Sequence, residues 1–201
     1  MLPIVLNPSQ VTIVVFGYGK ASQMKIKGIA RAGITCYVIS PEIAERTEGD
    51  QRIILEPGTY DQAHLDKGQL VIAATGSVSL NKKIIADARA KGKLVLSLSD
   101  GDQSDFHMMS WRKKGPVTVG LSTGNCAPKE SKRLIESIME IIDDETVERI
   151  AVLGQLRKKI KQLGYAPIKP VINKLTDESL ERLIELNALS LETLAEEIKK
   201  R

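Results

Sequence analysis

The residues whose types and spacing best suit ligand binding form a glycine turn near the start of the chain. Gly17 and Gly19 follow the apolar run VTIVVF and precede a segment with helical periodicity. A strand that leads through glycines into a helix presents backbone N–H groups and the positive helix end to a pyrophosphate. Gly17 would allow the tight turn and Gly19 the close approach of the ligand, while Ser22 replaces the third glycine of GxGxxG and is small enough for helix–strand packing. We expect a dinucleotide site here rather than a plain strand-to-helix turn.

Two further segments carry residues suited to the same cofactor. Glu42 is the first acidic residue after the second expected strand, and a carboxylate about 20 residues past the turn commonly binds the adenine ribose. No arginine stands at that strand end, which favours NAD over NADP. Thr75 and Gly76 end a later apolar run, where either a ligand or a simple turn with Ser77 or Ser79 as helix N-cap would account for them. The candidate cofactor-binding residues are Gly17, Tyr18, Gly19, Lys20, Ala21, Ser22, Ser40, Pro41, Glu42, Thr75 and Gly76.

Asp100 is the main candidate for a catalytic residue. It follows the apolar run LVLSLS and precedes Gly101. A carboxylate at this place can act as a general base, hold a cationic substrate group or simply cap a loop. The two histidines, His64 and His107, have no partner at metal-ligand spacing, so we expect no metal site.

Composition narrows the classes of protein that fit the chain. Its 201 residues are 42% hydrophobic, which is enough for a real core, and its net charge is only +4. Aromatic residues make up 3% and no basic stripe is present, so a nucleic-acid partner is not expected. Cys36 and Cys126 are far apart in sequence, which argues against a disulfide framework. No apolar run approaches the roughly 20 residues of a membrane helix, and we expect a cytoplasmic protein without membrane contact.

The positioning elements alternate between strands and helices up to Asp100. Near-continuous apolar strands that alternate with helices predict a parallel sheet covered on both faces. The expected strands are residues 11–17, 35–40, 52–57, 70–75 and 94–100.

After Asp100 the pattern changes. Residues 101–115 are polar and predict irregular structure, and residues 116–124 predict one more strand. From Lys129 onward apolar residues recur at helical spacing, and the two prolines of YAPIKP predict a break. Two short helices are expected after the break, at about residues 176–187 and 190–200.

Taken together, several segments resemble the precorrin-2 dehydrogenase family over about residues 1–142. The most specific piece is STGNCAP, a turn between a strand and a helix that is similar to the family's Ser-(Ser/Thr)-Gly-Gly-x-Ser-Pro. The segments that carry the resemblance are MLPIVLN, VFGYGKASQMKIKGIARAGITCYVISPEI, LVIAATGSVSLNKKIIADARAKGKLVLSLSD, DFHMM and VTVGLSTGNCAPKESKRLIESI.

The resemblance implies a fold and an activity. The fold would be α/β, with an NAD-binding Rossmann-type parallel sheet at residues 1–112, a small dimerisation region at 113–145 and a helical C-terminal domain at 146–201. The activity would be NAD-dependent oxidation of precorrin-2 to sirohydrochlorin by a homodimer. Asp100 falls on the family's catalytic aspartate, and the substrate-side turn falls on Ser122, Thr123, Gly124 and Asn125.

Two alternatives to the dehydrogenase stay open. Tyr18, Ala21, Asn125 and Ala127 depart from the family's usual residues, which would suit a module that binds a tetrapyrrole or NAD without oxidising it. Some family members also insert iron into sirohydrochlorin, so a chelatase is the other alternative. Spectral change that depends on a metal and not on NAD would identify the chelatase.

Overall fold

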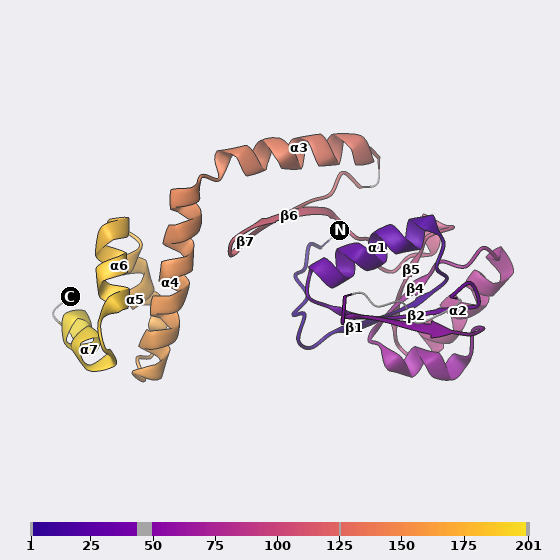
Figure 1. Cartoon of the computed structure of the whole chain (residues 1–201), viewed down its shortest axis with the longest axis horizontal. Coiled ribbons are helices and arrows are strands. Elements are labelled where there is room, and N and C mark those ends of the chain that lie inside the picture. Colours follow the sequence, from indigo (N-terminus) through magenta and orange to yellow (C-terminus); the bar gives the residue numbers. More distant parts are fainter. Residues whose placement is uncertain (1, 44–49, 125, 200–201) are drawn as a thin grey trace. The chain divides into compact units, whose positions relative to one another are not determined.

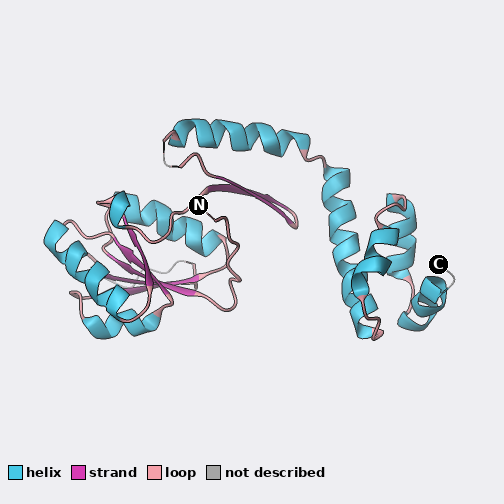
Figure 2. Ribbon diagram, turned by 180° about the vertical axis from the view of Figure 1, so that it is seen from behind, coloured by secondary structure: helices cyan, strands magenta, loops and turns pink. Residues whose placement is uncertain are grey.

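The computed structural model describes residues 2–43, 50–124 and 126–199 (Figures 1 and 2). The chain divides into two compact units, Met1–His107 and Met108–Arg201. Residue 112, the expected end of the first domain, lies within strand β6 (Ser110–Lys114) of the second unit. The division of the second unit into a dimerisation region and a helical domain stays a prediction.

The first unit is built on a five-stranded parallel sheet with the strand order β3-β2-β1-β4-β5. The chain runs outward from β1 to β3 and then returns to β4 on the other side of β1. The strand order therefore reverses between β1 and β4, the place where open α/β sheets bind their ligands. The strands are β1 (Thr12–Phe16), β2 (Thr35–Ser40), β3 (Ile53–Pro57), β4 (Leu70–Ala73) and β5 (Leu94–Ser97).

Helices cover both faces of this sheet, as the apolar strands predict. Helix α1 (Lys20–Arg31) connects β1 to β2, and α2 (Val78–Ala90) connects β4 to β5 on the opposite face (Figure 1). The core between α2 and the sheet includes Val14, Phe16 and Ile84, all at most 1% exposed. The short 3₁₀ segment η1 (Gln62–Lys67) adds Leu65 to this core. The expected Rossmann-type parallel sheet is confirmed.

The second unit begins with an antiparallel hairpin. Strand β6 (Ser110–Lys114) pairs with β7 (Val117–Leu121), and helix α3 (Pro128–Ile141) packs against both strands. The expectation of irregular structure over residues 101–115 is therefore wrong for β6. Its sequence, SWRKK, lacks the apolar alternation of a strand, and its pairing with β7 across the Gly115 turn fixes its conformation instead.

Among the described residues, the second unit continues with helices α4 (Asp144–Gln162), α5 (Ile168–Leu175), α6 (Leu180–Ala188) and α7 (Leu191–Lys199). They share a buried core that includes Leu156 of α4, Leu175 of α5, Leu183 of α6 and Leu194 of α7. The sequence did not predict α5, because two prolines stand at its start. Pro167 occupies the N-cap and Pro170 the first turn, where the missing N–H has no partner within the helix in any case.

None of the helices within residues 2–43, 50–124 and 126–199 is long and apolar enough to cross a membrane.

Candidate dinucleotide site

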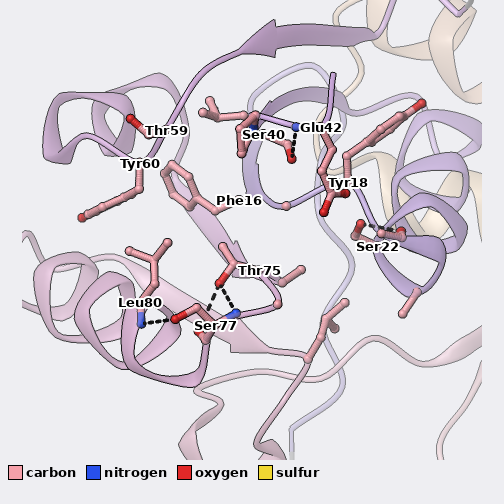
Figure 3. A pocket seen from close by; sticks show the side chains of 18 of the residues that line it. Phe16, Tyr18, Ser22, Ser40, Glu42, Thr59, Tyr60, Thr75, Ser77 and Leu80 are labelled. Carbon is pink, nitrogen blue, oxygen red and sulfur yellow. Dashed lines mark hydrogen bonds between the residues drawn. The ribbon is translucent and has the colours of Figure 1, made fainter. Parts of the chain in front are cut away.

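A cavity of about 470 Å³ opens over the carboxyl ends of the sheet strands in the first unit (Figure 3). All eleven candidate cofactor-binding residues line it, although they come from three separate segments of the chain. The full lining consists of Phe16, Gly17, Tyr18, Gly19, Lys20, Ala21, Ser22, Ile39, Ser40, Pro41, Glu42, Gly58, Thr59, Tyr60, Ala74, Thr75, Gly76, Ser77, Leu80, Leu98 and Ser99.

Gly17 lines the cavity where β1, β2 and β4 end side by side. Its N–H donates to the carbonyl of Ile39 at 2.9 Å, and its φ of 106° lies in the left-handed region. A Cβ at this position would come within 2.3 Å of the carbonyl oxygen of Ala74. Only glycine meets both demands, so the first glycine of the turn is required by the protein's own geometry.

At Gly19, no contact with the described residues requires a glycine. This residue is the N-cap of α1 with ordinary extended dihedrals, and a Cβ there would meet no described atom within 4 Å. No described side chain caps the helix through a hydrogen bond, and its first turn contains no acidic residue. The N–H groups in the first turn of α1, which have no partners within the helix, and the positive end of the helix dipole can therefore bind an anion in the cavity.

Ser22 occupies the third position of the motif in the first turn of α1. Its side chain is 2% exposed, and its hydroxyl donates to the carbonyl of Gly19 at 2.8 Å. A buried site of this size has no room for a long side chain without displacing its neighbours. The structure thus agrees with the expectation that this position needs a small residue.

The turn after β2 presents Glu42 to the cavity. The buried hydroxyl of Ser40 accepts a hydrogen bond from the Glu42 N–H at 3.3 Å, and the Ser40 carbonyl accepts one from the N–H of Gly58. Glu42 itself is exposed, and its side chain lies on the same side of the cavity as Tyr18 (Figure 3). The carboxylate is thereby held at the rim, where it is free to accept hydrogen bonds.

The turn after β4 caps a helix and also lines the cavity. The hydroxyl of Ser77 accepts a hydrogen bond from the N–H of Leu80 at 3.3 Å, so Ser77 is the N-cap of α2. Thr75, Gly76 and Ser77 also line the cavity. The same turn is therefore a helix cap and a cavity wall.

Sequence reasoning missed the aromatic wall that Tyr60 contributes after β3. The Tyr60 ring packs edge-on against Phe16, with 4.9 Å between ring centroids, and its hydroxyl donates to the Asp87 carboxylate at 2.7 Å. Burial and this hydrogen bond raise the pKa of Tyr60, so it remains a neutral phenol. The ammonium of Lys83 pairs with Asp87 and lies 5.2 Å from the ring centroid. The available signal was the GTY turn directly after the third strand.

Strand β5 ends at Ser97, so Asp100 lies in the turn after the strand and not at its end as expected. Asp100 does not line the cavity, whereas its neighbour Ser99 does. Its carboxylate accepts a hydrogen bond from the Asp102 N–H at 3.2 Å and so caps a single 3₁₀ turn, Gly101–Gln103. Its own N–H donates to the hydroxyl of Ser97 at 3.1 Å. The side chain is exposed, which leaves the carboxylate accessible for a further role.

The expected substrate-side turn belongs to the second unit, before α3. The Thr123 hydroxyl lies 2.8 Å from that of Ser131 and accepts a hydrogen bond from the N–H of Ala127 at 3.3 Å. Gly124 has a φ of 62°, and its N–H donates to the hydroxyl of Ser122. Asn125 lies outside the described residues.

No described group of three or more His, Cys, Asp or Glu side chains is arranged to hold a metal ion. Of the two cysteines, Cys126 is exposed and Cys36 is buried in β2. Burial raises the pKa of the Cys36 thiol to about 12, so this thiol stays protonated.

A parallel sheet with a glycine turn at its reversal point and a helix N-terminus facing the cavity defines a dinucleotide-binding domain of the Rossmann type. Residues 4–110 match the family described as "Putative NAD(P)-binding", and the chain belongs to this family. The cavity suits such a cofactor, because Gly19 leaves space beside the uncapped start of α1 and Lys20 adds a positive charge there. The expected nicotinamide dinucleotide cofactor is thus confirmed.

Three proteins to which this chain is similar are named precorrin-2 dehydrogenase or siroheme synthase. The chain is 28% identical over 162 residues to a precorrin-2 dehydrogenase of Bacillus subtilis, covering 79% of this chain and 99% of that protein. It is 30% identical over 166 residues to a siroheme synthase of Nitrosomonas europaea, covering 80% of this chain but only 35% of that protein. A solved structure named "SirC, precorrin-2 dehydrogenase" matches over 100% of both chains, with a TM-score of 0.71 and 16% identity, which shows the same fold. The resemblance expected from the sequence is confirmed.

Proposed function

We propose that this protein oxidises precorrin-2 to sirohydrochlorin with NAD as the oxidant. The observation that carries the proposal is that the eleven candidate residues from three separate segments line one cavity, and that Ser99, beside Asp100 in the turn after β5, lines the same cavity. The similarity to a protein named precorrin-2 dehydrogenase, over nearly the whole length of that protein, supplies the substrate.

The protein's own part begins with holding the cofactor. The N–H groups at the start of α1 would bind the pyrophosphate, and the Glu42 carboxylate would accept hydrogen bonds from the adenine ribose. Because Gly17 has no side chain, the turn can lie close against Ala74, which would let the pyrophosphate approach the start of α1. When bound, NAD supplies the hydride acceptor, and the protein supplies placement and proton transfer.

The oxidation removes two electrons and two protons from precorrin-2. One hydride carries both electrons and one proton, and the second proton must go to a base. The Asp100 carboxylate is exposed in the turn after β5, beside a cavity-lining serine, and is the group we assign to accept that proton.

The proposal also includes the residues that contact the substrate and the oligomeric state of the protein. Ser122, Thr123, Gly124 and Asn125 would contact precorrin-2, whose carboxylates suit a chain with a net charge of +4. We further propose that the protein works as a cytoplasmic homodimer in which residues 113–145 form the dimer contact.

An anaerobic assay with purified protein tests the proposal. Precorrin-2 should give the absorbance of sirohydrochlorin only when NAD is present. NAD binding without any turnover would instead identify a binding module. Metal-dependent spectral change in sirohydrochlorin without NAD would identify a chelatase.

The assignment of Glu42 predicts a change in cofactor preference. Glu42→Gln removes the negative charge that favours the ribose hydroxyls and repels a 2′-phosphate, so the preference for NAD over NADP should fall about 10-fold, which corresponds to ~1.4 kcal/mol. Calorimetric titration with each dinucleotide measures this preference. Glu56→Gln is the matched control, because Glu56 pairs with Lys67 at 2.9 Å and does not line the cavity. An unchanged preference in Glu42→Gln would remove Glu42 from the ribose site.

A further inference from the structure

A buried asparagine stands between the ends of β4 and β5. Asn81 lies in the first turn of α2 and its side chain is 2% exposed. Asn81 takes no part in the glycine turn or in the proton transfer proposed for Asp100. A polar amide buried at the edge of a cavity requires partners for all its hydrogen-bonding groups.

Asn81 has these partners on both neighbouring strand ends. Its Oδ1 accepts hydrogen bonds from the N–H of Thr75 at 3.1 Å and from the Thr75 hydroxyl at 2.6 Å. Its Nδ2 donates to the carbonyl of Thr75 at 3.0 Å and to the hydroxyl of Ser99 at 3.1 Å. Because a backbone N–H only donates and a carbonyl only accepts, Thr75 fixes which way the amide points.

The connection continues from Ser99 to Asp100 through Ser97. The hydroxyls of Ser99 and Ser97 lie 3.4 Å apart, and the Ser97 hydroxyl accepts the hydrogen bond from the Asp100 N–H at 3.1 Å. Ser97 is 4% exposed and Ser99 is exposed, so the Ser97 end of this link is the end that is shielded from water. The two serines of LSLSD therefore connect Asp100 to the amide of Asn81.

We propose that Asn81 is a positioning residue that locks the turn after β4 to the turn after β5. The lock fixes two cavity-lining residues, Thr75 and Ser99, relative to the Asp100 carboxylate. Asn81 is buried and all of its amide hydrogen-bonding groups have partners, so it can hold the two turns rigidly, and rigid support of a site keeps reacting groups at productive separations. The consequence for catalysis rests on the proposed dehydrogenase function, whereas the lock itself does not.

Amide hydrogen exchange tests the lock without any need for turnover. Asn81→Leu keeps the side chain's approximate size but removes all four bonds, and the amides of Thr75 and Asp100 should then exchange at least about 10-fold faster. Of the hydrogen bonds of Asn81, Ser99→Ala removes only the one to the turn after β5. It should therefore speed amide exchange at Asp100 and leave amide exchange at Thr75 unchanged. Ser99→Thr keeps a hydroxyl and should retain the protection at Asp100.

The control variant is Asp105→Ala. The Asp105 carboxylate binds Arg89 and the N–H of Val95, at the beginning of β5, and does not line the cavity. This variant loses comparable polar contacts, yet it should leave exchange at Thr75 and Asp100 unchanged. With precorrin-2 as substrate, Asn81→Leu should lower kcat by about 10-fold or more with a smaller change in KM, while Asp105→Ala keeps kcat.

The outcomes separate this inference from the proposed function. Unchanged exchange at Asp100 in both Asn81→Leu and Ser99→Ala would overturn the lock, as would equal losses of kcat in Asn81→Leu and Asp105→Ala. If Asn81→Leu does not fold, the Ser99→Ala and Ser99→Thr pair decides the matter. If the unmodified protein does not oxidise precorrin-2 but the exchange pattern is as expected, the proposed function fails and the lock stands.

Discussion

Replacing Asp100 by asparagine is expected to lower kcat for precorrin-2 oxidation by about 100-fold or more while leaving the Kd for NAD unchanged. Asparagine cannot accept the proton that the oxidation releases. Its side-chain oxygen can still accept the hydrogen bond from the Asp102 N–H, so the 3₁₀ turn after β5 should be preserved. Asp100 does not line the cavity, which is the reason for expecting normal NAD affinity.

The test of Asp100 combines steady-state kinetics with calorimetry. Asp102→Asn is the matched control, because it removes a carboxylate from the same turn without altering the proposed base. The control should keep nearly full activity. If Asp100→Asn retained the kcat of the unmodified protein, Asp100 would have no part in proton transfer.

The second large effect is expected at the glycine turn, where the two glycines serve different purposes. Gly17→Ala places a Cβ 2.3 Å from the Ala74 carbonyl at a φ of 106°, so the ends of β1 and β4 must move apart. The expected cost is more than about 2 kcal/mol of unfolding free energy, together with loss of measurable NAD binding.

Gly19→Ala is the informative comparison. Its Cβ meets no described atom within 4 Å and its backbone is extended, so the free energy of unfolding should stay the same. The added methyl group would occupy space beside the α1 N-terminus, and the Kd for NAD should rise about 10-fold or more. Thermal denaturation and NAD titration of both variants check these results. Normal NAD binding by Gly17→Ala would be incompatible with the turn described.

The sequence predicted most of the first unit because local signals and tertiary structure agree there. Strands such as β4 are buried at every position, and a parallel sheet is the structure that buries both strand faces. The glycine spacing located the cavity, and the ends of the second and fourth strands supplied its other predicted residues. Because these separate signals all mark the carboxyl ends of neighbouring strands, all eleven cofactor candidates line one cavity.

The features that sequence reasoning missed depend on partners distant in sequence. Tyr60 enters the cavity wall because β3 ends beside it and Phe16 and Asp87 hold its ring. Asn81 gains its role only when β4 and β5 lie side by side. Strand β6 likewise forms through its pairing with β7, since its own residues do not alternate between apolar and polar. No pattern confined to one segment encodes such contacts.

We propose that one cofactor site and one base together oxidise precorrin-2. The most direct test measures NADH and sirohydrochlorin simultaneously during a single anaerobic turnover of the unmodified protein. We predict that the two products appear at the same rate and in equal amounts, and that neither appears when NAD is omitted. Formation of sirohydrochlorin without NADH, or no reaction despite saturation of the cavity with NAD, would be incompatible with NAD-dependent oxidation at this site.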